Sequence, residues 1–72
     1  MKEIMEQKEP MPSFYSRDEL DSIGFASVGQ EVFISRKASI YGAEKISIGN
    51  HVRIDDFAVL SGRIAIEDYV HI

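Results

Sequence analysis

The second half of this 72-residue chain carries two interleaved ladders of apolar residues, each with a period of six. The first ladder contains Ile48, Ile54, Leu60, Ile66 and Ile72, and the second contains Ile46, Val52, Ala58, Ile64 and Val70. An amphipathic helix repeats its apolar positions about every 3.6 residues and a half-buried strand about every 2, so neither explains this period. A short fixed repeat is typical of a solenoid. The pattern therefore predicts a coil of short strands joined by tight corners.

The residue types at the expected corners support the same register. Two positions after successive members of the first ladder stand Asn50, Asp56, Gly62 and Asp68. Glycine adopts positive φ freely because it lacks a Cβ, and Asn and Asp tolerate it through local side-chain hydrogen bonds. We therefore expect left-handed backbone conformations at these four positions.

The repeat extends upstream with one interruption. Its upstream members are Val28, Ile34 and Ile40 in the first ladder and Val32 and Ala38 in the second. Between Ile40 and Ile46 the phase slips by two residues, so residues 41–45 should form a lengthened corner that bulges from the coil. Insertions of this sort lie at the surface and can carry function, although a harmless bulge is the simpler interpretation.

Residues 1–27 are expected to form a tail and a capping helix that precede the coil at 28–72. The charged start predicts a frayed tail or a short helix over residues 2–8. Ser16 and Glu19 have the spacing of a capping box, and Gly24 is a suitable C-terminal stop, so a helix should span Arg17 to Ile23. We expect its apolar face, with Phe14 and Phe25, to close the open end of the first coil.

Three hexapeptides carry a resemblance to a known family: VGQEVF (28–33), IGNHVR (48–53) and IDDFAV (54–59). They are similar to the repeats of left-handed β-helix acyltransferases, and residues 46–72 resemble most closely the sugar O-acetyltransferases, which include galactoside O-acetyltransferases. The resemblance implies an all-β fold, a left-handed parallel β-helix of about two and a half coils with a short N-terminal capping helix. The left hand follows from the resemblance alone, since parallel crossovers are right-handed in nearly all other folds.

Composition narrows the classes of partner and compartment. The chain has no cysteine, and its net charge of −4 comes without a basic cluster, which argues against disulfides, thiolate zinc sites and nucleic acid. It has no apolar run near the ~20 residues of a membrane span and no apolar signal core at its start, so a cytoplasmic protein is expected. Because Ile72 is an inward position without a polar cap, we expect the N-terminal part of a longer protein.

The resemblance implies an acetyltransferase that moves an acetyl group from acetyl-CoA to the hydroxyl of a sugar or nucleotide-sugar acceptor. It also implies a homotrimer, with acetyl-CoA docking mostly outside this chain. The alternative is a non-catalytic β-helical module that trimerises or stacks end to end. Fold alone does not decide between them, because one fold hosts many chemistries.

Acetyl transfer to a hydroxyl needs a general base, usually histidine, because its pKa lies near working pH. His71 is the candidate base, with an ordinary surface or interface residue as the alternative, and His51 beside a corner is a weaker candidate. Stacking on one face requires a separation of three hexapeptides, and the two histidines miss that register by two positions. Zinc ligands lie ~2 Å from the metal, so no metal site is expected from this pair.

Four further residues are candidates for binding the sugar: Asp55, Asp56, Ser61 and Tyr69. Asp56 is equally explained as corner chemistry, and Tyr69 could stack on a sugar ring or fill an interface. Asp55 and Ser61 hold the same slot in successive repeats and so occupy different faces, which means that they could share a site only across a trimer interface. Phe14, Tyr15 and Phe25 are an alternative sugar-binding lip.

Overall fold

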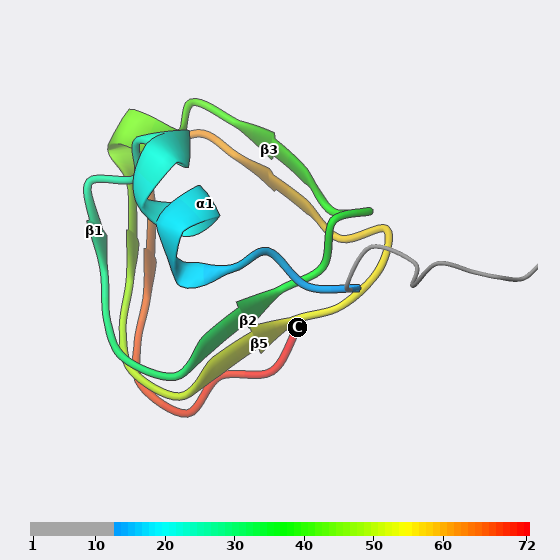
Figure 1. Ribbon diagram of the computed structural model, residues 1–72. Coiled ribbons are helices and arrows are strands. Elements are labelled where there is room, and N and C mark those ends of the chain that lie inside the picture. The colour runs from blue at the N-terminus through cyan, green and yellow to red at the C-terminus, as the bar shows by residue number, and fades with distance from the viewer. Residues whose placement is uncertain (1–12) are drawn as a thin grey trace, which may run out of the picture.

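Short strands wind along three faces of a triangular coil, and one helix lies over the coil's first opening (Figure 1). The computed structural model describes residues 13–72, so the tail or helix expected over residues 2–8 lies outside the described residues. The elements in chain order are α1 (Arg17–Ile23), β1 (Ser27–Val28), β2 (Val32–Ile34), β3 (Ser39–Tyr41), the 3₁₀ turn η1 (Ala43–Lys45), β4 (Ile46–Ile48), β5 (Val52–Ile54), β6 (Val59–Ser61) and β7 (Ile64–Ile66).

Each face of the coil is a parallel stack of strands from successive turns. The stacks are β1-β4-β7, β2-β5 and β3-β6. In Figure 1 the chain runs anticlockwise from β1 through β2 to β3 as it recedes from α1, which makes the coil left-handed. The predicted left-handed parallel β-helix is thus confirmed.

The register of the strands shows how long one turn is. Ile48 pairs with Ile66, which is a turn of three hexapeptides, whereas Val28 pairs with Ile48, which makes the first turn longer by two residues. The two extra residues of the first turn lie at η1, which follows Gly42 in the left-handed region with φ 72°. The lengthened corner predicted from the phase slip is therefore confirmed.

The ladder residues point inward and form the core. The buried core residues are Leu20, Val32, Ile34, Ala43, Ile46, Ile48, Val52, Ile54, Leu60 and Ile66. Ala58, Ile64 and Val70 are partly buried and pack against this cluster. Ile72 holds a ladder position but keeps 46% of its surface exposed. Because burying one such aliphatic side chain contributes about 1.5–3 kcal/mol, the ladders supply the main stabilisation of the coil.

Helix α1 has the predicted ends and the predicted role. The Ser16 hydroxyl accepts a hydrogen bond from the Glu19 N–H, the Glu19 carboxylate accepts one from the Ser16 N–H, and Gly24 ends the helix with φ 94°. Leu20 is buried in the core cluster, and Phe25 packs against that cluster. The helix therefore closes the first opening of the coil.

The chain before and within α1 also covers the free strand edges of the first turn. The Tyr15 N–H donates to the Ile34 carbonyl at 3.0 Å, and the Arg36 N–H donates to the Ser13 carbonyl at 2.9 Å. Arg17 donates to the carbonyls of Val28 and Gly29 at the end of β1. Covered edges do not offer unpaired backbone groups to another chain.

The corners depart from the prediction by one residue. Gly62 has positive φ as expected, but at the other corners the left-handed residues are His51, Phe57 and Tyr69, each directly after the expected Asn or Asp. The Asn and Asp side chains at these corners instead form hydrogen bonds to the preceding turn of the coil. The three contacts are Gln30 N–H to Asn50 Oδ1 at 2.8 Å, Asn50 N–H to Asp68 Oδ1 at 2.7 Å, and Ser35 Oγ–H to Asp56 Oδ1.

Candidate active site on the β2–β5 face

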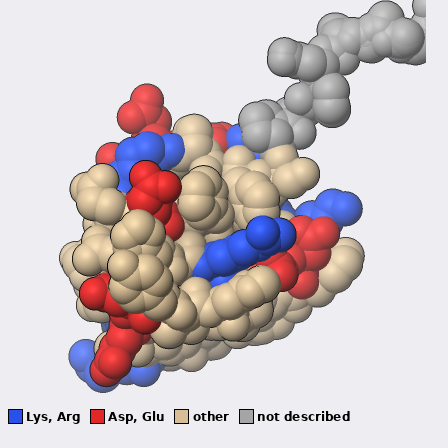
Figure 2. Space-filling view, turned by 90° about the horizontal axis from the view of Figure 1, so that it is seen from below, with Lys and Arg blue, Asp and Glu red and all other residues tan. Residues whose placement is uncertain are grey.

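Outward side chains of three successive turns form a column on the face that contains β2 and β5. Phe33 pairs with Arg53 in the parallel ladder, and Arg53 pairs with His71 in an isolated parallel bridge. Paired residues of parallel strands project their side chains to the same side. Figure 2, which looks onto this face, shows basic and acidic side chains lying next to one another.

Asp55 lies at the centre of the polar contacts on this face. Its Oδ1 accepts a hydrogen bond from Nε of Arg53 at 2.8 Å, and its Oδ2 lies 2.7 Å from Nε2 of His71. The hydrogen bond from Arg53, and secondly the one with His71, hold the pKa of Asp55 below its ordinary value. Asp55 is therefore ionised at neutral pH and acts only as an acceptor.

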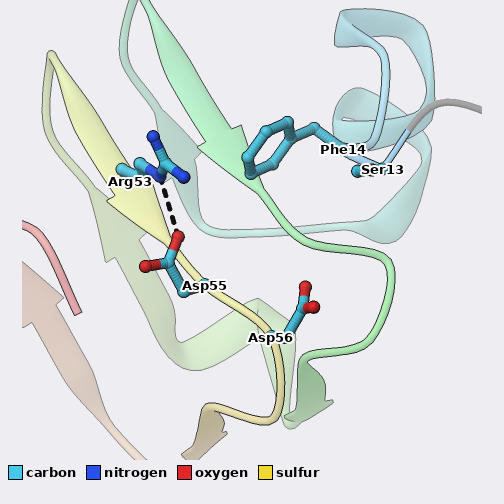
Figure 3. Close-up of a pocket in the computed structure, with 5 residues that line it drawn as sticks. All are labelled: Ser13, Phe14, Arg53, Asp55 and Asp56. Carbon is cyan, nitrogen blue, oxygen red and sulfur yellow. Dashed lines mark hydrogen bonds and ion pairs between the residues drawn. The ribbon is translucent and has the colours of Figure 1, made fainter.

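The same carboxylate borders a pocket of about 400 Å³ lined by Ser13, Phe14, Arg53, Asp55 and Asp56. Figure 3 shows Arg53 and Asp55 linked on one side of this pocket, with Asp56 on the next stretch of chain and Phe14 opposite. The Arg53 guanidinium lies 5.3 Å from the centre of the Phe14 ring, a cation–π distance. The pocket thus combines an aromatic wall with one cation and two carboxylates.

Phe14 corrects one expectation about the capping segment. It was expected to close the open end of the coil with α1, but its ring packs edge-on against Phe33 on the outer face, with centroids 5.9 Å apart. An antiparallel bridge pairs Phe14 with Ser35, the residue after β2, and so places Phe14 beside that strand. Phe14 and Tyr15, both named for the alternative sugar-binding lip, border different hollows, and that of Tyr15 lies beside α1.

Asp56 is fixed by a buried hydroxyl. Ser35, of which only 1% is exposed, donates its Oγ–H to Asp56 Oδ1, and its Oγ accepts a hydrogen bond from the Lys37 N–H at 3.0 Å. Asp56 therefore bonds to the preceding turn and does not take the left-handed conformation expected of it, and its carboxylate also lines the pocket.

The other predicted site residues lie elsewhere on the coil. Ser61 ends β6 on a different face, as expected from its repeat position. Tyr69 stacks on His51 at a corner, with ring centroids 4.7 Å apart and planes at 6°. His51 thus neighbours Tyr69 and not His71, which agrees with a turn of three hexapeptides. Among residues 13–72 the structure shows no group of three or more ligating side chains that could hold a metal ion.

Sequence reasoning singled out His71 and Asp55 but missed their contact, and it did not assign Arg53 to the site. The signal was present in the register. Arg53 lies one turn of three hexapeptides before His71, and Asp55 is the next outward residue along the same stretch of chain. An imidazole bonded to a carboxylate can accept a proton and return it, which suits general acid–base chemistry.

Comparison with known proteins identifies relatives of this chain. No family model matches the chain. A dTDP-4-amino-4,6-dideoxy-D-glucose acyltransferase from Escherichia coli is 60% identical over 57 residues, which are 75% of this chain and 30% of that protein. Within residues 13–72, no helix has the length and apolar character needed to cross a membrane.

Solved structures of AntD, an N-acyltransferase from Bacillus cereus, superpose closely on the chain. A Ser-to-Thr mutant bound to dTDP and coenzyme A has a TM-score of 0.82 and 61% identity, over 86% of this chain and 33% of AntD. AntD bound to dTDP and 3-hydroxybutyryl-CoA also gives 0.82, with 62% identity over 85% of this chain and 32% of AntD. The chain spans about a third of the length of these relatives. By its repeats, its coil and these likenesses, the chain belongs to the hexapeptide-repeat, left-handed β-helix acyltransferase superfamily.

Proposed function

We propose that this chain is part of an acyl-CoA-dependent N-acyltransferase whose acceptor is the amino group of a dTDP-linked amino sugar. The observation that carries the proposal is the 60% identity with an acyltransferase named for dTDP-4-amino-4,6-dideoxy-D-glucose. A Ser-to-Cys mutant of AntD bound to that amino sugar nucleotide and coenzyme A supports it.

The proposed acceptor and donor differ from the sequence expectation. The resemblance to sugar O-acetyltransferases implied a hydroxyl acceptor and acetyl-CoA. The relatives are named for an amino sugar or as N-acyltransferases, and AntD has been solved with 3-hydroxybutyryl-CoA. We therefore propose transfer to nitrogen, from an acyl-CoA that need not be acetyl-CoA.

In the proposed reaction the neutral amine nitrogen attacks the carbonyl carbon of the thioester. A C–N bond forms and the C–S bond breaks, so coenzyme A leaves as the sulfur fragment. The proton lost by the nitrogen passes to His71 and from there to the sulfur, which gives an amide and the free thiol. A base positioned in this way typically contributes about 10²–10⁴-fold to the rate.

The pocket bordered by Asp55, the residue that contacts His71, suits part of the acceptor. Asp55 and Asp56 present carboxylate oxygens to it, and Phe14 supplies an apolar wall. Sugar sites commonly combine such polar groups with an aromatic surface. Ser61 and Tyr69 lie on other parts of the coil, so in this proposal they contact substrate only where a neighbouring copy completes the site.

We propose a homotrimer because a neighbouring copy would be needed to bring Ser61 and Tyr69 to the site, and one exposed surface supports this assembly. Tyr41, Phe57 and Val59, which are 61%, 77% and 64% exposed, lie on or beside the β3–β6 face. Exposed apolar groups gathered in one region mark interaction sites. This surface also favours the second candidate, a non-catalytic assembly module.

The test replaces the matching segment of AntD with residues 13–72 of this chain. The graft is assayed with dTDP-4-amino-4,6-dideoxyglucose and 3-hydroxybutyryl-CoA by thiol release and by the mass of the sugar product. We expect N-acylation with a kcat/KM within about tenfold of AntD, a change of less than ~1.4 kcal/mol in transition-state stabilisation.

Two controls make the result specific. A dTDP-sugar with a hydroxyl in place of the amine should give no product. A graft that folds, assembles and binds coenzyme A but transfers nothing to the amine would contradict the proposed function and support the assembly module.

A further inference from the structure

We propose that Asp55 is a positioning residue that selects one tautomer of His71, so that Nε2–H faces Asp55 and Nδ1 is the atom that takes the acceptor's proton. This inference rests on the proposed function and adds to it the identity of the reacting nitrogen. It is argued from the backbone register, the position of Arg53 and the hydrogen-bonding capacity of an ionised carboxylate.

The backbone fixes where His71 stands. The Arg53 N–H donates to the Val70 carbonyl at 2.9 Å, and the Ile72 N–H donates to the Arg53 carbonyl at 2.8 Å. The Asp55 N–H donates to the Ile72 carbonyl at 3.0 Å. Both neighbours of His71 are thus bonded to the chain of β5 and its continuation, and the imidazole must project from the outer face beside Arg53.

This placement decides which ring nitrogen reaches Asp55. The Asp55 side chain lies two residues beyond Arg53 on the same outer face, which is about 6–7 Å farther along the strand. The imidazole has to extend diagonally to meet it, and its distal nitrogen, Nε2, makes the contact at 2.7 Å. Nδ1, nearer the backbone, is left to face other groups.

Arg53 decides which partner donates. It holds Oδ1 of Asp55 at 2.8 Å through Nε, and this bond is the largest cause of the lowered pKa of Asp55. The ionised carboxylate has only acceptor atoms, so the hydrogen of the 2.7 Å contact must belong to Nε2. A neutral imidazole carries one N–H, and with that hydrogen on Nε2 its lone pair for accepting a proton lies on Nδ1.

The reaction then has a defined proton path. When the acceptor nitrogen forms its bond to the thioester carbonyl carbon, its proton moves to Nδ1 and His71 becomes an imidazolium. Asp55 faces the resulting positive charge across the existing hydrogen bond. The proton then leaves Nδ1 for the sulfur of coenzyme A as the C–S bond breaks, which restores the starting tautomer.

His51 is a natural internal control, because it stacks on Tyr69 and has no carboxylate bonded to it within residues 13–72. The chain contains only these two histidines. Long-range ¹H–¹⁵N correlation on the histidine-labelled full chain reads each tautomer directly. At a pH where the rings are neutral, we expect His71 to carry its hydrogen on Nε2.

Asp55→Asn is the informative variant. Arg53 needs an acceptor, so the new amide should turn its oxygen to Arg53 and its NH₂ to His71. That NH₂ can only donate, which should move the ring hydrogen to Nδ1. Asp55→Glu should restore the Nε2–H form, and Glu67→Gln, which removes one exposed carboxylate from another site, should change neither tautomer.

The same variants are made in the AntD graft for kinetics. Asp55→Asn should lower kcat by roughly 10–10³-fold, since a wrong tautomer removes the base. Because asparagine keeps a polar side chain of the same size at the pocket, the KM for the amino sugar nucleotide should change less than about threefold. Asp55→Glu should recover part of the loss, and Glu67→Gln should match the parent graft.

The outcomes separate this inference from the proposed function. A native His71 with its hydrogen on Nδ1, or an active graft whose kcat is unaffected by Asp55→Asn, would overturn the role of Asp55. A graft that makes no amide although the tautomer shifts as predicted would overturn the proposed function and leave tautomer selection by Asp55 supported.

Discussion

Truncating Leu60 and its neighbour Val59 to alanine tests the inward ladder on a single strand. The two residues are adjacent on β6 and point to opposite sides, and the structure leaves 5% of Leu60 and 64% of Val59 exposed. Both substitutions remove only aliphatic groups. Since Leu60 loses one more carbon than Val59, only a difference well above one methylene, about 0.8 kcal/mol, reports burial.

The magnitudes follow from that burial. Cutting Leu60 back to a methyl loses about 2.4 kcal/mol at ~0.8 kcal/mol per buried methylene, and the cavity raises the cost to about 3–4 kcal/mol. A chain of this length has roughly 4–11 kcal/mol of stability in total, so this loss is a large fraction. At about 4–8 °C per kcal/mol, the midpoint of thermal unfolding should fall by at least roughly 12 °C. Val59→Ala should cost at most about 0.5 kcal/mol.

Urea unfolding of the full chain, followed by far-ultraviolet circular dichroism and tyrosine fluorescence, measures both values; the chain has three tyrosines and no tryptophan. Equal losses for the two variants, or a larger loss for Val59→Ala, would refute the argument that the six-residue ladder is the core.

Three other predictions concern the corners and the cap. Gly49→Ala should destabilise the coil by about 3 kcal/mol, because its Cβ would stand 2.9 Å from the Asp68 nitrogen of the next turn. The Cβ of Gly62→Ala meets open space, so this variant should lose only the ~1–2 kcal/mol of its left-handed backbone. Equal urea midpoints for the two variants would contradict this. Ser16→Ala should lose about 1 kcal/mol with the cap of α1, and an unchanged midpoint would show that the cap contributes nothing. The hydrogen bond from Arg36, followed by that from the Ser16 N–H, lowers the pKa of Glu19 from 4.5 to about 2. Because this folded-state pKa is depressed, the contribution of Glu19 to stability is fully present above pH 4.5 and is lost as the pH falls toward 2. The thermal midpoints of the chain and of Glu19→Gln should therefore converge over that range. A gap between the two midpoints that stays constant down to pH 2 would contradict this.

Most of the fold could be predicted because one repeat encodes it several times. The ladders gave the inward positions, the phase slip gave the η1 corner, and the spacing of Ser16 and Glu19 gave the ends of α1. Local patterns of this kind need no knowledge of distant contacts. The corner conformations were misplaced by one residue because Asn50 and Asp68 were assigned to backbone strain, whereas their side chains bond between turns.

The site was less predictable because it depends on contacts between turns and beyond the repeat. A turn of three hexapeptides places His71 beside Arg53, but only the geometry shows that Asp55 links the two. Phe14 lies outside the repeat, so no periodic signal could place it on the same face. The hexapeptides specify the coil whatever the substrate, which is why the amino acceptor came from relatives and not from these residues.

The candidate site depends most on the three-hexapeptide turn that sets His71 against Arg53, and cysteine cross-linking tests this register directly. The chain has no native cysteine, so Arg53→Cys combined with His71→Cys gives one possible intramolecular disulfide. Neighbouring parallel strands hold paired side chains close enough to cross-link, whereas an offset of two residues adds about 6–7 Å. We predict rapid oxidation of the 53/71 pair, seen by peptide mass spectrometry, and little for His51→Cys combined with His71→Cys. Preferential cross-linking of the 51/71 pair would contradict the register and, with it, the Asp55–His71 site.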